Sequence, residues 1–184
     1  MPLLGRRKSF DYKLPLDVSC ESMIEEVERL AHDRDYLALA AISLQYLRSS
    51  HLSPDYFIAR KWAGRMLEKA GSDAVDAILA VLRFDQTLDE LAIVLVQIAD
   101  PKAVPTLKRL LDGGAFSHQP DIDRIASFVN AHPQASTNPE PVVCAVCGKL
   151  FALDDTQTLN AERRGKYRGE EWYCSGRCRR IALA

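Results

Sequence analysis

Four cysteines near the C-terminal end are the residues whose type and spacing could do chemistry: Cys144, Cys147, Cys174 and Cys178. Two cysteines separated by two residues can turn back on themselves in a knuckle, and Gly148 permits the positive φ that this turn usually requires. Cys174 and Cys178 are four residues apart, so they share one face if a helix begins at Cys174. The spacing therefore predicts two pairs of thiolates that meet at one metal ion.

Zinc is the metal that this ligand set predicts. Four thiolates in a tetrahedron suit Zn²⁺ and leave no position open for water, so we expect one structural zinc ion per chain and no catalytic one. An iron–sulfur cluster or Cu(I) would also accept four thiolates. A redox disulfide between Cys144 and Cys147 would need a thioredoxin-like βαβ context, which the sequence lacks. The fifth cysteine, Cys20, is expected to be a small buried or semi-buried thiol.

The cysteine-bearing segment, residues 142–184, resembles a treble-clef zinc finger of the TRASH and YHS kind. The matching residues are 144–148 at the knuckle and the run from Tyr167 to Ser175 that leads into the last helix. The resemblance implies a small α+β domain in which a knuckle and a hairpin are followed by a helix that supplies the last two ligands. Those families include suspected metal sensors and metal-handling modules as well as interaction modules.

The chain before this segment is predicted to fold into amphipathic helices, and these helices must position it. Apolar residues recur at helical spacing, and capping residues delimit the helices. Ser22 and Glu25 fit a capping box, and Gly71 is a natural helix terminator. Asp100 should cap the helix that follows Pro101. The predicted helices cover about residues 22–31, 35–48, 54–70, 74–82, 88–98, 101–112 and 120–129.

The third of these helices is expected to bury one apolar side. The residues placed on that side are Ile58, Ala59, Trp62, Ala63, Met66 and Leu67. Apolar residues at this spacing are more often core than a binding site, although an exposed tryptophan would be a hot spot for a partner.

Residues 74–82 match residues 103–111 in their apolar positions, at an offset of 29 residues. A helix pair repeated at a short fixed period is typical of an α-solenoid. The phrase from Ile98 to Leu107 resembles the turn and following helix of short HEAT-like repeats, and the resemblance extends over about residues 35–130. It implies a scaffold that binds other proteins. A compact all-α domain without repeats is the alternative.

The fold class expected is an all-α helical repeat domain, an α-solenoid, with a small C-terminal four-cysteine zinc finger. Residues 1–18 are expected to be a flexible N-terminal segment, residues 19–131 the HEAT-like domain and residues 132–141 a proline-containing linker. Residues 142–184 form the zinc finger. A domain as small as the last has too little core to fold unaided, so metal binding would supply much of its folding free energy.

Composition is that of an ordinary globular protein, with 47% hydrophobic and 27% charged residues and a net charge of −1. No apolar run approaches the length needed to span a bilayer, and no signal peptide is evident, so we expect a cytoplasmic protein with no membrane partner. No phosphate-binding loop or nucleophile elbow is present. The four histidines do not lie at ligand spacing. We therefore expect no enzymatic activity and no small-molecule substrate.

The leading functional hypothesis is a non-catalytic adaptor that binds a partner protein through its helices. The first alternative is a metal-handling or metal-responsive protein that uses the four-cysteine site. The second is a nucleic-acid-associated factor, because residues 149–184 hold eight Lys or Arg and five Asp or Glu. A cationic footprint of that size supports only weak, salt-sensitive contact with nucleic acid.

Overall fold

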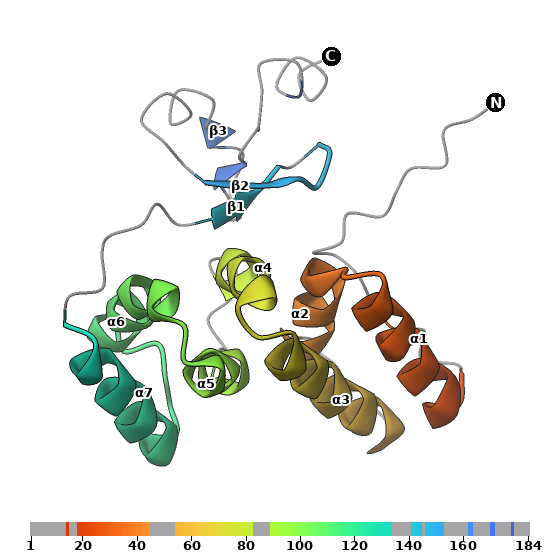
Figure 1. Ribbon diagram of the computed structural model, residues 1–184, viewed down its shortest axis with the longest axis horizontal. Helices are drawn as coiled ribbons and strands as arrows, with labels where there is room; N and C mark the ends of the chain where they lie inside the picture. Colours follow the sequence, from red (N-terminus) through yellow and green to blue (C-terminus); the bar gives the residue numbers. More distant parts are fainter. Residues whose placement is uncertain are drawn as a thin grey trace.

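The computed structural model describes residues 14, 18–44, 54–82, 89–133, 141–144, 146–152, 162–163, 170–171 and 178. In this part of the chain the fold is mostly helical, as expected, and two short antiparallel strand pairs follow the helices (Figure 1). The helices are α1 (Cys20–His32), α2 (Tyr36–Leu44), α3 (Pro54–Ala70), α4 (Ser72–Leu82), α5 (Asp89–Ile98), α6 (Val104–Asp112) and α7 (Gln119–Ala131), with a 3₁₀ turn, η2 (Pro101–Ala103), before α6.

Helices α2 to α7 form three consecutive pairs, α2/α3, α4/α5 and α6/α7. Helix α2 contacts α4 of the next pair, α3 contacts α5, and α5 contacts α7. Helix α1 covers the outer side of the first pair through contacts with α3 and α2 (Figure 1). Equivalent helices of the first two pairs thus pack against each other, and the second pair meets the third through α5 with α7 and α4 with η2. This packing buries faces that an isolated pair would leave exposed.

The helix ends confirm most of the predicted capping and terminating residues. Helix α3 ends directly before Gly71, which has φ +60°, and Gly114 follows α6 with φ +65°. Glycine has no Cβ to oppose this left-handed conformation. The Asp100 side chain accepts a hydrogen bond from the backbone N–H of Lys102 at 2.9 Å, so it caps the η2 turn that leads into α6.

The predicted start of the first helix was wrong by about one turn. The N-cap of α1 is Ser19, whose Oγ accepts a hydrogen bond from the backbone N–H of Ser22 at 3.2 Å. Ser22 therefore sits inside the helix and no capping box forms with Glu25. The pattern was ambiguous because both serines can cap a helix, and the earlier one lets the helix keep an extra turn.

The predicted buried side of α3 was also wrong in part. Ile58 is 49% exposed, whereas Arg60 is 3% exposed. Helix α3 packs against α1 and α2 on one side and against α5 on another. Its neighbours therefore cover more of its surface than the single apolar stripe predicted from the sequence. Trp62 is half-buried against α1, where its Nε1 donates to Glu28 Oε1 at 3.2 Å.

Helix α4 lies at the centre of the fold and is buried on almost every side. All of its residues from Ala74 to Leu82 are buried except Asp76. Helices α2, α3 and α5 cover part of its circumference, and the strands β1 (Pro141–Val143) and β2 (Leu150–Ala152) cover another part (Figure 1). A helix that is apolar nearly all round needs neighbours all round.

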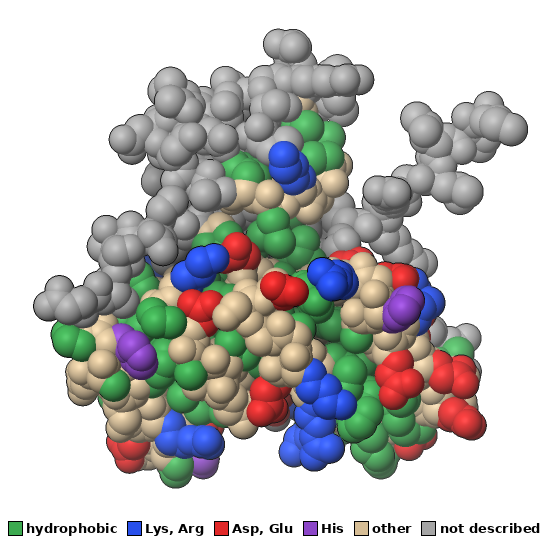
Figure 2. Space-filling model, in the orientation of Figure 1, with side chains coloured by type: hydrophobic (Ala, Val, Ile, Leu, Met, Phe, Trp, Pro, Cys, Tyr) green, Lys and Arg blue, Asp and Glu red, His purple; other side chains and the backbone are tan. Residues whose placement is uncertain are grey.

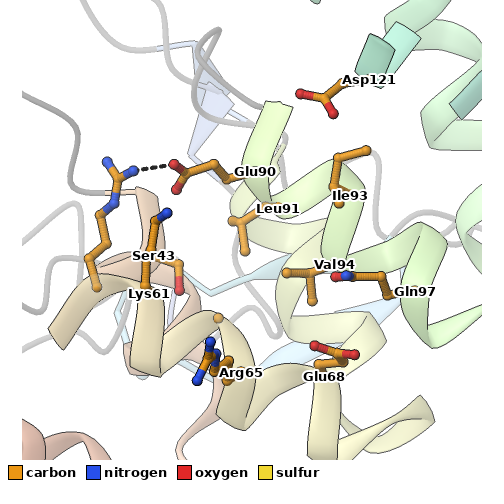
Figure 3. A pocket seen from close by; sticks show the side chains of 12 residues that line it. Ser43, Lys61, Arg65, Glu68, Glu90, Leu91, Ile93, Val94, Gln97 and Asp121 are labelled. Atoms are coloured by element: carbon orange, nitrogen blue, oxygen red, sulfur yellow. Dashed lines mark hydrogen bonds and ion pairs between the residues drawn. The ribbon is translucent and has the colours of Figure 1, made fainter. Parts of the chain in front are cut away.

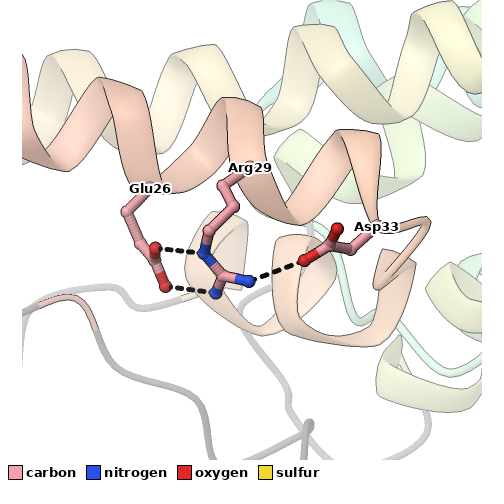
Figure 4. A network of polar contacts seen from close by, with 3 residues as sticks. All are labelled: Glu26, Arg29 and Asp33. Carbon is pink, nitrogen blue, oxygen red and sulfur yellow. Dashed lines mark hydrogen bonds and ion pairs between the residues drawn. The ribbon is translucent and has the colours of Figure 1, made fainter.

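The outer face of α1 is polar and carries a small ion-pair network. Arg29 pairs with Glu26 at 2.7 Å and with Asp33 at 2.6 Å (Figure 4). These are i,i+3 and i,i+4 pairs on an exposed helix surface, where such contacts contribute little stability. The opposite face of α1 turns Met23, Val27 and Leu30 into the core.

The strand pairs are short. Strand β1 pairs antiparallel with β2 in the register Val142 opposite Phe151. Strand β3 (Glu162–Arg163) pairs antiparallel with β4 (Glu170–Glu171). Among the described residues, no helix has both the length and the apolar character to cross a bilayer.

Candidate metal centre

The first two cysteines lie in a tight turn between β1 and β2. Cys144 directly follows β1, and its backbone N–H donates to the carbonyl of Lys149 at 2.9 Å. The N–H of Gly148 donates back to the carbonyl of Cys144 at 3.0 Å. Gly148 has φ +72°, which confirms that the knuckle needs a left-handed residue at this position. This turn brings Cys144 and Cys147 onto the same side of the hairpin end.

Three cysteine sulfurs converge at this knuckle. The Sγ atoms of Cys144, Cys147 and Cys178 all lie within 4.8 Å of one another. Metal–sulfur bonds of about 2.3 Å give a tetrahedron with sulfur–sulfur edges of about 3.8 Å, so a modest approach would place the three sulfurs around one ion. Cys178 comes from a segment far away in sequence, so the cluster joins two ends of the C-terminal region.

Burial differs among the three cysteines. Cys144 is fully buried, Cys178 is partly buried and Cys147 is exposed. A thiolate is costly to bury without a compensating charge, and a bound cation would compensate it. The donor set of soft sulfur atoms therefore fits a soft or borderline metal, and the exposed Cys147 marks the side of the cluster that solvent reaches.

The hairpin that carries the knuckle packs against helix α4. Val143 is 3% exposed and belongs to the same continuous core as the helices, and Leu150 packs against that core (Figure 1). Cys144 is the next residue along the chain after Val143. One side of the cysteine cluster is thereby fixed to the helical layer by apolar contact.

Two parts of the predicted site lie outside the described residues. The fourth predicted ligand, Cys174, is one of them, so the four-cysteine set stays a prediction. Most of the basic residues that suggested nucleic-acid contact are also outside: Arg164, Lys166, Arg168, Arg177, Arg179 and Arg180. The linker assigned to residues 132–141 is described only at its ends, and the division of the chain into domains stays a prediction.

Sequence reasoning did not find a second polar feature, a groove between α3 and α5. Ser43 of α2 and Arg60 of α3 are buried there. A serine inside an apolar helix and an arginine on a helix give no signal in the sequence, because both residues are usually exposed. Gly64 in the middle of α3 was the available clue, since glycine is unfavourable in a helix interior.

Comparisons with models of protein families, with curated proteins and with solved structures give no match to this chain. The resemblances to HEAT-like repeats and to TRASH and YHS fingers therefore stay predictions. The fold and the site by themselves define a mostly helical protein with a cluster of three cysteines that could hold a metal ion.

Proposed function

We propose that this chain is a non-catalytic scaffold protein in which one structural zinc ion fastens the C-terminal segment to a helical protein-binding layer. The ion would be held by Cys144, Cys147 and Cys178, with Cys174 as the fourth ligand. Bound zinc would supply cross-linking bonds and neutralise the thiolates. The observation that carries the proposal is the meeting of three sulfurs at a knuckle whose hairpin shares the helical core.

The order of the elements supports both finer assignments. Three stacked helix pairs are what a short HEAT-like solenoid would form, and such scaffolds bind partners along their exposed helix faces. A knuckle, a second hairpin and a late cysteine follow in the order expected of a treble-clef finger. In this arrangement the helical layer makes the contacts with a partner protein, and the metal centre keeps the C-terminal segment in place.

The test compares two serine substitutions in purified protein. Cys144→Ser removes a ligand from the cluster, while Cys20→Ser removes a partly buried cysteine on α1 that lies outside it. We expect one tightly held zinc per chain in the wild type and in Cys20→Ser by elemental analysis, and its loss in Cys144→Ser. Absence of zinc from the wild type, or equal loss in both variants, would contradict the proposal.

A metal-handling role is the second candidate, and the exposure of Cys147 favours it. An accessible thiolate offers an incoming chelator or acceptor a way to attack the bound metal, because ligand exchange proceeds through a mixed complex. The two candidate functions predict different rates of zinc release. A structural site should release zinc to a chromogenic chelator over hours, and a metal-handling site should release it within seconds to minutes.

A further inference from the structure

The three cysteines of the cluster differ in their access to solvent. Cys147 is exposed, Cys178 is partly buried and Cys144 is fully buried, although their sulfur atoms all lie within 4.8 Å of one another. A dissolved oxidant therefore meets the Cys147 sulfur first. Cysteines that respond to oxidants are typically accessible and lie beside a second cysteine that can react with the oxidised sulfur. The cluster has both of these features.

The knuckle keeps Cys144 close to Cys147 by its own backbone hydrogen bonds. The N–H of Cys144 donates to Lys149 at 2.9 Å, and the N–H of Gly148 donates to Cys144 at 3.0 Å. Cys178 reaches the cluster from a segment much later in the chain, so its position depends on long-range contacts. A disulfide bond is about 2.05 Å long, so the Cys144 and Cys147 sulfurs need to approach by about 3 Å at most. Cys144 is therefore the expected partner of an oxidised Cys147.

Oxidation of this pair would remove two of the thiolates that ligate the proposed ion. A metal-bound cysteine is a thiolate, and the thiolate is the nucleophilic form. Attack by the Cys147 thiolate on hydrogen peroxide breaks the O–O bond, gives a sulfenic acid and releases hydroxide. The Cys144 thiolate then attacks the oxidised sulfur, which forms the disulfide bond and releases a second hydroxide. Two thiolates thus give two electrons to one peroxide.

The hairpin that carries the knuckle covers an apolar side of α4. Both β1 and β2 contact α4, and Val143, next to Cys144, is part of the helical core (Figure 1). Figure 2 shows hydrophobic side chains on the hairpin and on the helical layer beneath it. Strands of three residues give a hairpin little stability of its own. Without a bound ion, the contact with α4 would be the main attachment of this hairpin.

We propose that the cysteine cluster is an oxidation-sensitive switch. A hydroperoxide converts Cys144 and Cys147 to a disulfide, the metal ion is released, and the β1–β2 hairpin loosens from α4. The switch rests on the zinc site proposed above and adds its regulation. A dithiol reductant reverses the oxidation by thiol–disulfide exchange. Because the two cysteines lie on a hairpin turn and not at a helix N-terminus, which would activate a thiol, the disulfide acts as a switch and not as a catalyst.

The experiment treats the full-length, zinc-loaded protein with hydrogen peroxide. Zinc release is followed with a chromogenic chelator, and the disulfide is located by peptide mapping with mass spectrometry. Cys147→His is the test variant, because histidine is also a zinc ligand but forms no disulfide. Cys20→Ser is the matched control, since it removes a partly buried cysteine of α1 and leaves the cluster intact. Metal content and circular dichroism are measured on every protein.

We expect peroxide to produce the Cys144–Cys147 disulfide in the wild type and in Cys20→Ser, and to speed zinc release by roughly tenfold or more. Dithiothreitol followed by zinc should reverse both changes. Cys147→His should release its zinc no faster with peroxide than without it. A disulfide between any other pair of cysteines, oxidation without a disulfide, or equal release from Cys147→His and the wild type would overturn the proposal. If Cys147→His binds no zinc, the wild-type peptide map and release rate decide the outcome.

Amide hydrogen exchange measures whether the hairpin loosens from α4. Exchange in β1 and β2 should become roughly tenfold faster or more after oxidation, and should slow again after reduction and addition of zinc. The groove between α3 and α5 serves as an internal reference (Figure 3), because its described lining residues belong to α2, α3, α5 and α7 and none belongs to α4 or the strands. Unchanged exchange in β1 and β2, or equal acceleration in α3 and α5, would contradict the loosening.

The metal analysis separates this inference from the proposed function. Protein that holds zinc but forms no Cys144–Cys147 disulfide refutes the switch and leaves the structural site standing. Protein that contains no zinc refutes the structural site and the release step. In that protein, the peptide map still decides whether Cys144 and Cys147 pair on oxidation.

Discussion

The helical layer and the cysteine region are stabilised in different ways. Helix α4 is covered by three other helices and contributes a continuous run of buried residues. Strands β1 and β2 have three residues each, and β3 and β4 have two. An isolated hairpin of that length is at best marginally stable in water. Burial holds the first region together, whereas the second has its contact with α4 and, on the function proposed above, a metal ion bound at the cysteine cluster.

Removing the proposed zinc ion should give the largest effect and separate the behaviour of the two regions. A strong zinc chelator should release the C-terminal region, because structural zinc contributes on the order of 10 kcal/mol to small domains. We expect amide hydrogen exchange to become fast in β1 and β2 while helical circular dichroism changes little. Loss of most helical signal on chelation would show that the two regions are not held separately.

Truncation of a core side chain should act on the helical layer. Ile42 of α2 is fully buried, so Ile42→Ala should lower the free energy of unfolding by about 2–5 kcal/mol. The same substitution at Ile58, which is exposed, should cost less than about 0.5 kcal/mol. Urea denaturation measures both. Equal costs at the two positions would contradict the burial of Ile42 and the exposure of Ile58.

Alkaline pH should weaken the helical layer through Tyr56. Burial raises the pKa of Tyr56 to about 12 from its ordinary value of 10.0, although the nearby Arg60 charge acts in the opposite direction. Below pH 10 the phenol is protonated in the folded and the unfolded chain. Between pH 10 and 12 the unfolded chain ionises first, so stability falls as pH rises, by at most about 2–3 kcal/mol.

The Tyr56→Phe variant isolates that effect, because it removes the titrating group and keeps the ring. The difference between the urea midpoints of the wild type and the variant should change in the alkaline range, because only the wild type loses stability through this phenol. Midpoints are measured from about pH 8 upward, since an ordinary tyrosine pKa is about 10. Parallel curves for the two proteins would show that the phenol of Tyr56 titrates normally in the fold.

Val143 tests how far the two regions depend on each other. It is buried in the helical core from the strand next to Cys144, so Val143→Ala removes about two methylene equivalents of burial, or about 1.5–2 kcal/mol. We expect weaker zinc retention in a chelator competition, with α1 to α3 unchanged in hydrogen exchange. Zinc retention equal to that of the wild type would mean that the metal site forms without support from α4.

The smallest effect is expected at the surface of α1. Arg29→Ala removes the contacts with Glu26 and Asp33, which are exposed pairs worth about 0.2–1 kcal/mol. Thermal melts at low and high salt should show a difference from the wild type that shrinks as salt screens the charges. A difference of several kcal/mol would indicate a structural role for this network.

The sequence predicted where the helices lie better than it predicted which of their faces are buried. Gly71 ends α3 as expected, because glycine is the residue favoured for a left-handed conformation at a helix end. Ser19 and Ser22 are both competent caps, so the start of α1 was not determined locally. The exposure of Ile58 and the burial of Arg60 follow from how α3 lies between its neighbours, which a periodic pattern along one helix does not contain.

In the candidate site, too, the sequence predicted local features better than long-range contacts. The knuckle at Cys144, Cys147 and Gly148 follows from local spacing, and the structure confirms its turn. The approach of Cys178 to that knuckle is a long-range contact, which spacing predicted only through the chemistry of metal ligation. The packing of Val143 on α4 had no sequence signal, because one valine in a short strand fits many surroundings.

The position of α4 has a consequence for the order of synthesis. The helix is complete well before the hairpin that covers one of its sides, and Cys178 emerges later still. At about 5–20 residues per second, that side of α4 stays uncovered on the nascent chain for on the order of ten seconds. During this interval we expect the nascent chain to expose an apolar strip of α4, which β1 and β2 cover once they have emerged and paired.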